Sequence, residues 1–548
     1  MDQADTHQVF NQSPPLENVN LYRQDPALQA AVRREGAAWA EPMLADYGAL
    51  VGGELQAAGF AANAQAPVLH THDPRGYRID CVAFHPAYHL LMAAATASGW
   101  PTLPWAAPQP GVHVARAAME YLHHQAESGT GCPLTMTFAA VPVIRRNPAL
   151  AAVWEPLLLS RDYDPDNRPW FDKRGATVGM GMTEKQGGTD VRANTTRAAQ
   201  TDSTELGDTY EIVGHKWFMS APMCDAFLVL AQAEKGLSCF LLPRWRPDGS
   251  RNQLYLQRLK DKLGNRSNAS GEVEFRGAFA WRLGDEGRGV ATILEMVALT
   301  RFDCMVGSAS LMRGALVQAL HHCQHREVSG RRLVEQPLMQ NVLADMAVES
   351  EAALVMSMRV ARALDQAPQD SHEQQLLRVA TALGKYLVCK RAPGLVYEAM
   401  ECLGGNGYVE ESVLPRLYRE APVNAIWEGS GNVQCLDVLR ALDRSPESRE
   451  AILAELELAR GLASDFDRFL GQTVQAVTDP AHREYRARRT VEHLALALQA
   501  SLLLRFGNAA TAEAYCRSRL GGDAGYLYGS LPVAPGEARA IIEAARLS

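Results

Sequence analysis

The chain has 548 residues, of which 47% are apolar, 21% charged and 7% aromatic, a composition that excludes disordered, collagen-like and coiled-coil proteins. Its 54 Lys and Arg against 62 Asp and Glu give a net charge of −8, which excludes the strongly basic surface of a dedicated nucleic-acid coat. Any site for a polyanion must therefore be local, and the length predicts roughly three to four structural units.

Four regions follow one another along the chain. Apolar residues at three- and four-residue spacing predict a helical N-terminal domain over 1–177, and short β-rich runs predict a middle β domain over 178–286. Helical periodicity then predicts a bundle over 287–444, which opens with one long buried helix over the segment 289–326. After a Pro-containing break, 445–548 forms a further helical tail. Strands held between helical blocks do not make an alternating Rossmann pattern.

The cysteines and the N-terminal residues indicate the cellular compartment in which the protein is expected. The ten Cys residues are scattered without a CxxC pair, so neither a zinc knuckle nor a disulfide framework is predicted, and a reducing cytoplasm is expected. Residues 1–22 carry acids and prolines in place of a secretory signal and are expected to form an arm lying on a surface. No apolar stretch reaches the roughly 20 residues that cross a bilayer, so no membrane partner is predicted.

Two motifs in the middle domain could hold a flat, anionic ligand. The segment VGMGMTEKQGGTDV, from Val178 to Val191, combines glycines with hydroxyl side chains, so that backbone N–H groups can approach an anion or a heteroaromatic ring closely. A plain polar β-turn is the alternative. The run VGHKWFMS places Trp217 and Phe218 just before Ser220, and a pair of core aromatics would explain it as well.

Two more motifs lie in the helical bundle. In AMECLGGNGYVEES, Gly404 and Gly405 would end a helix and expose amides to a phosphate, although an ordinary helix C-cap explains them equally. In LYREAPVNAIWEGSGNVQCLDVLR, Glu428 interrupts an apolar stretch. A carboxylate in apolar surroundings has a raised pKa and is a stronger base toward a weakly acidic C–H proton. The alternative is an N-cap for the helix that begins near Asn432.

Together these four segments resemble the acyl-CoA dehydrogenase family along the whole chain. The resemblance implies a mainly α protein with a central β domain: an N-terminal α domain, a middle β-barrel domain and a C-terminal four-helix bundle, followed here by an extra helical domain. It also implies FAD as cofactor, dehydrogenation of an acyl-CoA at a CH–CH bond, and a homotetramer. Glu428 becomes the catalytic base, because the other position that the family uses for the base holds Thr300 here.

The resemblance also assigns the cofactor site, with the flavin ring on the middle-domain motifs and the outer end of FAD on an arginine and two glycines of the bundle. The residues carried over are Met182, Thr183, Gln186, Gly188, Thr189, Trp217, Phe218, Ser220, Arg326, Gly404, Gly405, Ile426, Trp427, Ser430 and Asn432. Four departures from the family's pattern argue against ordinary fatty acyl-CoA turnover. They lie at Lys185, Ser329, Glu401 and Asn432.

Further segments, among them VFNQ, KDKLGNRSNAS and IWEGSGN, resemble a narrower branch of the family. Members of that branch are flavoproteins of the adaptive response to DNA alkylation, which bind DNA through their C-terminal helices and have at most weak dehydrogenase activity. The resemblance implies non-specific binding and protection of double-stranded DNA, or repair of alkylated bases, with weak activity on short or branched acyl-CoA. A dehydrogenase of fatty-acid or branched-chain catabolism without a DNA role is the alternative.

The tail can bind DNA only through a local cluster of cations, because from residue 443 onward 13 Arg face 14 Asp and Glu. A solvated helix face, with Glu484 and Glu492 as partners, is the alternative. The predicted phosphate contacts are Arg483, Arg486, Arg488 and Arg489, with a second cluster at Arg517 and Arg519.

One cluster of residues has the side-chain types of a metal site. His321, His322, Cys323 and His325 stand near the end of the long predicted helix, and the spacing puts His321 and His325 on one face. No second pair of ligands follows at a matching distance. We therefore predict no metal.

Overall fold

The computed structural model describes residues 6–547, and their contacts divide the chain into two units. One unit is Glu54–Asp303, which we call the middle unit. The other, the helical unit, joins the chain up to Gly53 to the chain from Cys304 onward. The predicted division at 177, 286 and 444 stays a prediction.

The first part of the middle unit is helical, but it also contains a hairpin that the sequence analysis missed. Strands β1 (Val68–His72) and β2 (Arg78–Ala83) pair antiparallel. The turn between them is set by Asp73, whose Oδ1 accepts from the backbone N–H groups of Arg75 and Tyr77 at 2.8 and 2.9 Å. The helices of this part are α3 (Gln56–Ala64), α4 (Pro86–Ser98), α5 (Leu103–Ala106), α6 (Val112–Ala126), α7 (Gly131–Ile144) and α8 (Pro148–Leu158).

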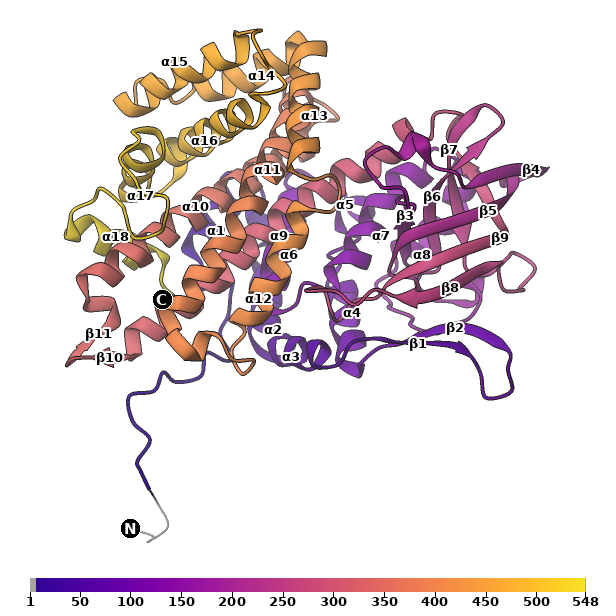
Figure 1. Cartoon of the computed structure of the whole chain (residues 1–548), viewed down its shortest axis with the longest axis horizontal. Coiled ribbons are helices and arrows are strands. Elements are labelled where there is room, and N and C mark those ends of the chain that lie inside the picture. The colour runs from indigo at the N-terminus through magenta and orange to yellow at the C-terminus, as the bar shows by residue number, and fades with distance from the viewer. Residues whose placement is uncertain (1–5, 548) are drawn as a thin grey trace. The chain divides into compact units, whose positions relative to one another are not determined.

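The β-rich runs form one seven-stranded sheet that closes on itself, which confirms the predicted middle barrel (Figure 1). The closure follows the pairings β5–β4, β4–β6, β6–β7, β7–β9 and β9–β5, with β3 added between β5 and β6 and β8 at the edge of β9. A closed sheet leaves few unpaired edges. Its strands are β3 (Val178–Gly181), β4 (Arg197–Thr204), β5 (Gly207–Ser220), β6 (Ala226–Ala233), β7 (Gly236–Pro243), β8 (Leu254–Leu259) and β9 (Ser270–Leu283).

A buried ionic cluster ties α6 to the first turns of the long helix α9 (Gly289–His325). The Arg116 guanidinium, fully buried, donates to both carboxylate oxygens of Asp303 at 2.7 and 2.5 Å, and Thr135 Oγ1 donates to the same carboxylate at 2.6 Å. Arg116 also lies 3.6 Å over the ring of Phe138. Burial and the nearby Asp303 carboxylate raise the pKa of Glu120, which accepts from Arg116 at 3.2 Å, well above its usual range.

The helical unit is built on α9, α10 (Pro337–Gln366) and α11 (Ser371–Leu403). The long helix predicted over 289–326 is confirmed as α9, which ends just before a short hairpin of β10 (Glu327–Val328) and β11 (Arg331–Arg332). Asp370 caps the N-terminus of α11 by accepting from His372 N at 2.8 Å. The other helices before the tail are α1 (Pro26–Arg34), α2 (Glu41–Leu50), α12 (Leu414–Glu420) and α13 (Gly431–Arg444).

The tail begins at the predicted break, where Ser445 Oγ accepts from Ser448 N at 3.1 Å and caps α14. Its helices pack on α10 and α11 (Figure 1). A buried ion cluster fastens it: Arg519 donates to Asp345 at 2.5 Å and to Glu349 at 3.1 Å, while Arg391 of α11 binds the same Glu349 carboxylate at 2.9 and 3.0 Å. The tail helices are α14 (Pro446–Glu457), α15 (Ser464–Thr478), α16 (Ala487–Phe506), α17 (Ala509–Tyr515) and α18 (Pro535–Ala545).

The N-terminal segment runs as the predicted arm over the end of α9. Asn11 donates to Glu327 O at 2.8 Å, Ser13 Oγ bonds His322 Nδ1 at 3.0 Å, and His321 Nε2 bonds Pro14 O at 2.8 Å. The histidines of the helix end thus hold the arm. Residues 1–5 of the predicted arm lie outside the described residues.

The described part of the chain contains neither a metal-binding cluster nor a helix that could span a membrane. Between residues 6 and 547, no group of three or more His, Cys, Asp and Glu is arranged to hold a metal ion. Within the same residues, no helix combines the length and the apolar character needed to cross a bilayer.

Candidate cofactor and substrate site

The ends of β3 and β5 bring the middle-domain residues together. Met180 of β3 pairs with Ser220 of β5, and Trp217 N donates to Thr183 O at 2.8 Å. Gly188 folds back on Thr183 so closely that a Cβ at this position would lie 2.3 Å from Thr183 Oγ1. The two separate sequence motifs therefore form one site in space.

A buried ion pair lies beneath this site. Lys216 Nζ donates to Glu184 Oε1 at 3.0 Å and to Leu230 O at 2.7 Å, while Glu184 also accepts from Thr195 N and Thr196 N at 2.7 and 3.2 Å. Burial would raise the pKa of Glu184, but the Lys216 cation and these hydrogen bonds outweigh it and lower the pKa to about 2. The carboxylate is therefore ionised, and it fixes the backbone next to Thr183.

The rest of the middle-domain set surrounds this core. Gln186 donates to Asn194 Oδ1 at 3.2 Å, and Asn194 in turn donates to Met182 O at 3.0 Å. Phe218 is 46% exposed on its strand, and Lys260 Nζ lies 3.3 Å from the centroid of the Trp217 ring. Thr189 is exposed in the turn that follows. The exposed ring of Phe218 beside the lysine-covered ring of Trp217 suits a flat, anionic cofactor.

Glu428 lies in the loop before α13, in the helical unit. Its φ of 57° and that of Gly429, 95°, are both in the left-handed region. Glu428 is half-buried and follows Ile426, which is 66% exposed, so the apolar enclosure expected from sequence is not formed within one chain. The N-cap position of α13 belongs to Ser430, which excludes the alternative of Glu428 as N-cap. Trp427 Nε1 donates to an asparagine of the same loop, Asn424, at 3.1 Å.

The glycines and Arg326 gather at the far ends of two helices. Gly404, with φ 61° and ψ −139°, ends α11, as the C-cap alternative predicts, and a Cβ at Gly404 or Gly405 would meet nothing within 4 Å. Cys323, near the end of α9, lies next to Cys402, near the end of α11, and its thiol raises the pKa of Cys402. The ends of the two helices therefore lie side by side. Arg326 there donates to the backbone oxygen of the arm's asparagine at 2.6 Å.

These residues lie apart from the Glu428 loop within one chain. Lys385 of α11 donates a hydrogen bond to Trp427 O in the Glu428 loop, whereas Gly404 is the C-cap of the same helix. At 1.5 Å rise per residue, Lys385 and Gly404 are separated by roughly 28 Å along the helix. The predicted set therefore falls into three places: the β3–β5 site, the Glu428 loop with Ser430 and Asn432, and the Arg326–glycine corner.

The predicted DNA contacts divide into two groups. Arg483 pairs with Asp443 at 2.5 Å, Arg486 pairs with Asp479 at 2.7 Å, and Arg489 is exposed. These residues lie at the start of α16, where the helix N-terminus adds positive potential. Arg488 donates to Asn432 Oδ1 at 2.8 Å and so joins the tail to the predicted cofactor segment.

The second predicted cluster is wrong for Arg519. This guanidinium is 12% exposed and bonded to Asp345 and Glu349, so it is not available to a phosphate. Arg517 is paired with Glu537 at 2.7 Å. The physical reason is that the carboxylates of α10 hold Arg519 in place to dock the tail.

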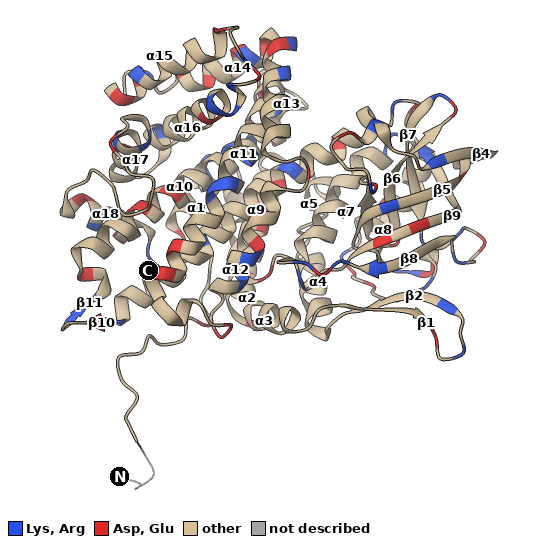
Figure 2. Ribbon diagram, in the orientation of Figure 1, with Lys and Arg blue, Asp and Glu red and all other residues tan. Residues whose placement is uncertain are grey.

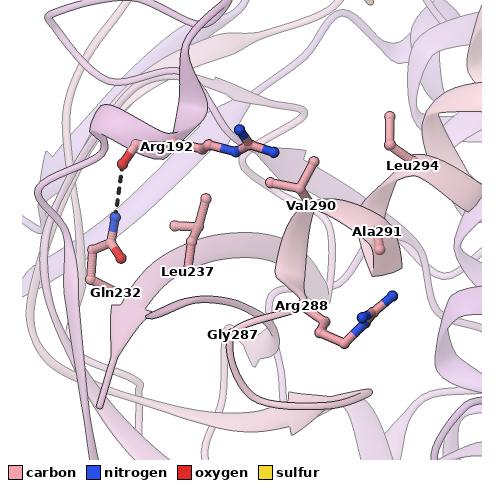
Figure 3. Close-up of a pocket in the computed structure, with 8 residues that line it drawn as sticks. All are labelled: Arg192, Gln232, Leu237, Gly287, Arg288, Val290, Ala291 and Leu294. Carbon is pink, nitrogen blue, oxygen red and sulfur yellow. Dashed lines mark hydrogen bonds between the residues drawn. The ribbon is translucent and has the colours of Figure 1, made fainter. Parts of the chain in front are cut away.

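A pocket in the middle unit joins apolar and cationic groups. Its volume is about 490 Å³. Val290, Ala291 and Leu294 from the first turns of α9 line it, and Figure 3 shows the guanidinium groups of Arg192 and Arg288 on either side of them. Arg192 stands immediately after the VGMGMTEKQGGTDV segment. An amphipathic ligand with phosphate groups matches such a lining.

Comparison with known proteins identifies the family of the chain. It matches the description "Adaptive response protein AidB N-terminal domain" over residues 11–165, "Acyl-CoA dehydrogenase, middle domain" over 179–278 and "Acyl-CoA dehydrogenase, C-terminal domain" over 287–442. It is 47% identical over 94% of both chains to "Putative acyl-CoA dehydrogenase AidB" of Escherichia coli. The chain belongs to the acyl-CoA dehydrogenase family and is a homologue of AidB.

Two comparisons with a nematode relative agree. The chain is 32% identical to "Acyl-CoA dehydrogenase family member 11" of Caenorhabditis elegans, over 85% of this chain and 78% of that one. The solved structure of Caenorhabditis elegans ACDH-11 in complex with C11-CoA matches with a TM-score of 0.85 and 28% identity, covering 94% of this chain and 93% of that one. The predicted family and fold class are confirmed.

Membership makes the chain an oxidoreductase of the acyl-CoA dehydrogenase type, with FAD as its cofactor. The residues present fit FAD. Gly404 and Gly405 leave open space where a side chain would block a phosphate, and the β3–β5 site offers Thr183, Ser220 and the half-exposed Phe218 to a ring.

Sequence reasoning missed several residues of these places. Arg192 and Arg288 were not singled out, although both directly follow Gly-containing turns at the ends of predicted elements. Lys216 stands inside a recognised motif, but its buried pairing with Glu184 joins strands far apart in sequence. Only the lone lysine in the apolar run TALGKYLVC signalled Lys385.

Proposed function

We propose that the chain is a flavoprotein of the adaptive response to DNA alkylation, which binds duplex DNA non-specifically and protects it, and which dehydrogenates acyl-CoA weakly. The observation that carries the dehydrogenase part is the pocket beside Arg192 and Arg288, whose apolar and cationic lining suits the pantetheine and phosphate groups of a coenzyme A thioester. The nematode relative crystallised with C11-CoA supports the same substrate class.

In the proposed reaction, the Glu428 carboxylate removes the proton α to the thioester carbonyl. FAD, when bound, supplies the acceptor for the hydride that leaves the β carbon. Thr183 and Ser220 would hold the flavin ring, and Ser430 and Asn432 stay predicted contacts to the cofactor. Lys185, which replaces the usual proline next to Thr183, agrees with a site that no longer supports high turnover.

Replacing Arg192 and Arg288 by Gln together should raise the KM for C11-CoA roughly 30-fold, because each of the two lost charge-assisted phosphate contacts removes about 1 kcal/mol of binding free energy. The kcat should change little. Steady-state kinetics with an artificial electron acceptor, repeated at increasing salt, would measure both. A double variant with an unchanged KM at low salt would show that coenzyme A does not bind in this pocket.

The DNA part of the proposal rests on the cations at the start of α16. Figure 2 shows acidic and basic residues interspersed along the tail helices, in line with the near balance of 13 Arg and 14 Asp and Glu from residue 443 onward. Arg483 and Arg486 can exchange their single carboxylate partners for DNA phosphates, and Arg489 can exchange solvent for one. Contacts to phosphates do not depend on base sequence, as non-specific protection of DNA requires. Arg488 would have to release Asn432 first.

The double substitution Arg483→Gln and Arg489→Gln should lower the affinity for a duplex roughly tenfold and reduce the slope of log K against log salt by about 2, because each lost phosphate contact removes about 0.9. Fluorescence anisotropy with a labelled duplex across a salt series measures both quantities. The matched control, Arg460→Gln with Arg468→Gln, removes the same charge from a different part of the tail and should leave the slope nearly unchanged. Equal slopes for both double variants would place the DNA site elsewhere.

We also propose a homotetramer in the cytoplasm. The separation of the Arg326–glycine corner from the Glu428 loop within one chain supports it, since a second copy could bring the two together around one FAD. Light scattering of the purified protein would give the mass of the assembly. A stable monomer that retains FAD would contradict this part of the proposal.

A further inference from the structure

A buried ammonium group lies under the Glu428 loop. Lys385 of α11 is 1% exposed, and its Nζ donates to three main-chain carbonyls: Asn424 O at 3.0 Å, Trp427 O at 2.8 Å and Gly429 O at 3.0 Å. A lysine ammonium has three N–H donors, so all of them are used on this one loop. The three acceptors stand before and after Glu428 in the chain.

The loop needs such support because its backbone is strained. Glu428 has a φ of 57°, in the left-handed region. This backbone conformation is unfavourable for a non-glycine residue and is kept only where the surrounding structure imposes it. Between Ala425 and the start of α13 the chain has no regular helix or strand. Gln434 adds two bonds, from Nε2 to Glu428 O at 3.2 Å and to Gly429 O at 2.9 Å. Side chains therefore hold carbonyl groups that secondary structure does not.

We infer that Lys385 is a positioning residue for Glu428: its ammonium gathers the carbonyls on both sides of the base and so fixes the backbone from which the carboxylate extends. The inference rests on the proposed role of Glu428 as base. Lys385 does not touch the reacting atoms in this account. The buried Lys173 of the middle unit divides its bonds between the Asp225 carboxylate at 2.7 Å and Asp164 O at 2.9 Å, whereas Lys385 donates to three main-chain carbonyls around Glu428.

The test compares Lys385→Met, an unbranched side chain one atom shorter that has no donor, with Lys385→Gln, whose amide has two N–H donors. We expect Lys385→Met to bind FAD and to lower kcat for C11-CoA roughly 10²-fold, with KM changed less than about twofold, because misplacing a base by about 1 Å costs that much in the chemical step. Lys385→Gln should fall between Lys385→Met and the unaltered protein.

Hydrogen exchange gives a readout that does not depend on turnover. The amides of Ile426 and Trp427 bond Val423 O at 2.9 and 3.0 Å, so their exchange rate reports the opening of the loop. Lys385→Met should accelerate exchange at both amides. The control is Val388→Ala, which removes apolar packing from a 1%-exposed position of the same helix without removing a bond to the loop. It should lower the melting temperature and leave kcat and the loop amides unchanged.

Three results would overturn the inference. The first is a folded Lys385→Met protein with FAD whose kcat lies within about twofold of the unaltered protein. The second is loop exchange in Lys385→Met equal to that in Val388→Ala. The third is failure of both Lys385 variants to fold, which would assign the residue to folding alone. Glu428→Gln separates this inference from the proposed function: if it leaves turnover unchanged, the base assignment fails, whatever the Lys385 variants do.

Discussion

Replacing Glu428 by Gln should leave FAD bound and reduce the rate at which acyl-CoA bleaches the flavin by roughly 10²–10⁴-fold. The amide has nearly the size of the carboxylate and makes the same demand on the left-handed backbone, so the loop should keep its conformation. What is lost is the group that accepts the α proton. Stopped-flow absorbance under anaerobic conditions, with C11-CoA and a short branched acyl-CoA as probes, would measure the rate.

The control for this variant is Glu411→Gln, which removes an exposed carboxylate from the same unit, outside the proposed site. It should bleach at the rate of the unaltered protein. If Glu428→Gln also bleached at that rate, Glu428 would not be the base. If the unaltered protein bound FAD and duplex DNA but did not bleach with any acyl-CoA, only the DNA-protecting part of the proposal would remain.

The second large effect concerns the docking of the tail. Glu349→Gln should reduce the free energy of unfolding by about 3–5 kcal/mol at pH 7, because it leaves the buried guanidinium of Arg519 and the partly exposed guanidinium of Arg391 without their shared carboxylate. The mutated side chain is nearly isosteric, so little of the loss comes from packing. Urea denaturation followed by far-UV circular dichroism would measure it.

The stabilisation that Glu349 provides should depend on pH. Burial would raise the pKa of Glu349, but the Arg391 and Arg519 cations and their hydrogen bonds lower it from 4.5 to about 2. Because unfolded Glu349 takes up its proton at higher pH than the folded form, the stabilisation is complete above pH 4.5 and is lost as the pH falls toward 2. The gap in stability between the unaltered protein and Glu349→Gln should therefore narrow by roughly 3 kcal/mol over that interval.

Arg517→Gln is the matched control for this prediction, because its partners Glu513 and Glu537 are on the surface and exposed ion pairs contribute little. Its unfolding curve should stay close to that of the unaltered protein at every pH. A Glu349→Gln protein as stable as this control would mean that the cluster does not fasten the tail.

Local patterns predicted the elements well wherever one stretch of chain decides the structure. The Pro-free apolar repeat predicted α9, the β-rich runs predicted the barrel, and Ser445 before Pro446 predicted the start of the tail. The hairpin β1–β2 was missed because its strands are short and lie between strongly helical segments, and only the turn after His72 signals it.

Residues whose role depends on partners far along the chain could not be predicted. Arg519 looked like a surface cation, yet its carboxylate Asp345 stands 174 positions earlier. Lys385 bonds Asn424 across 39 positions, and no local spacing indicates that pairing. A motif singled out Glu428 as the predicted base, but its left-handed backbone is a property of the fold. Periodicity reports which face is buried, and not which buried polar groups meet.

The most direct test is the visible spectrum of the purified full-length protein, recorded before and after anaerobic addition of C11-CoA. We expect the absorption bands of oxidised flavin in the untreated protein and a slow loss of those bands after the thioester is added. A colourless protein that takes up no FAD when the cofactor is supplied would contradict the assignment of the β3–β5 site and of Glu428 together.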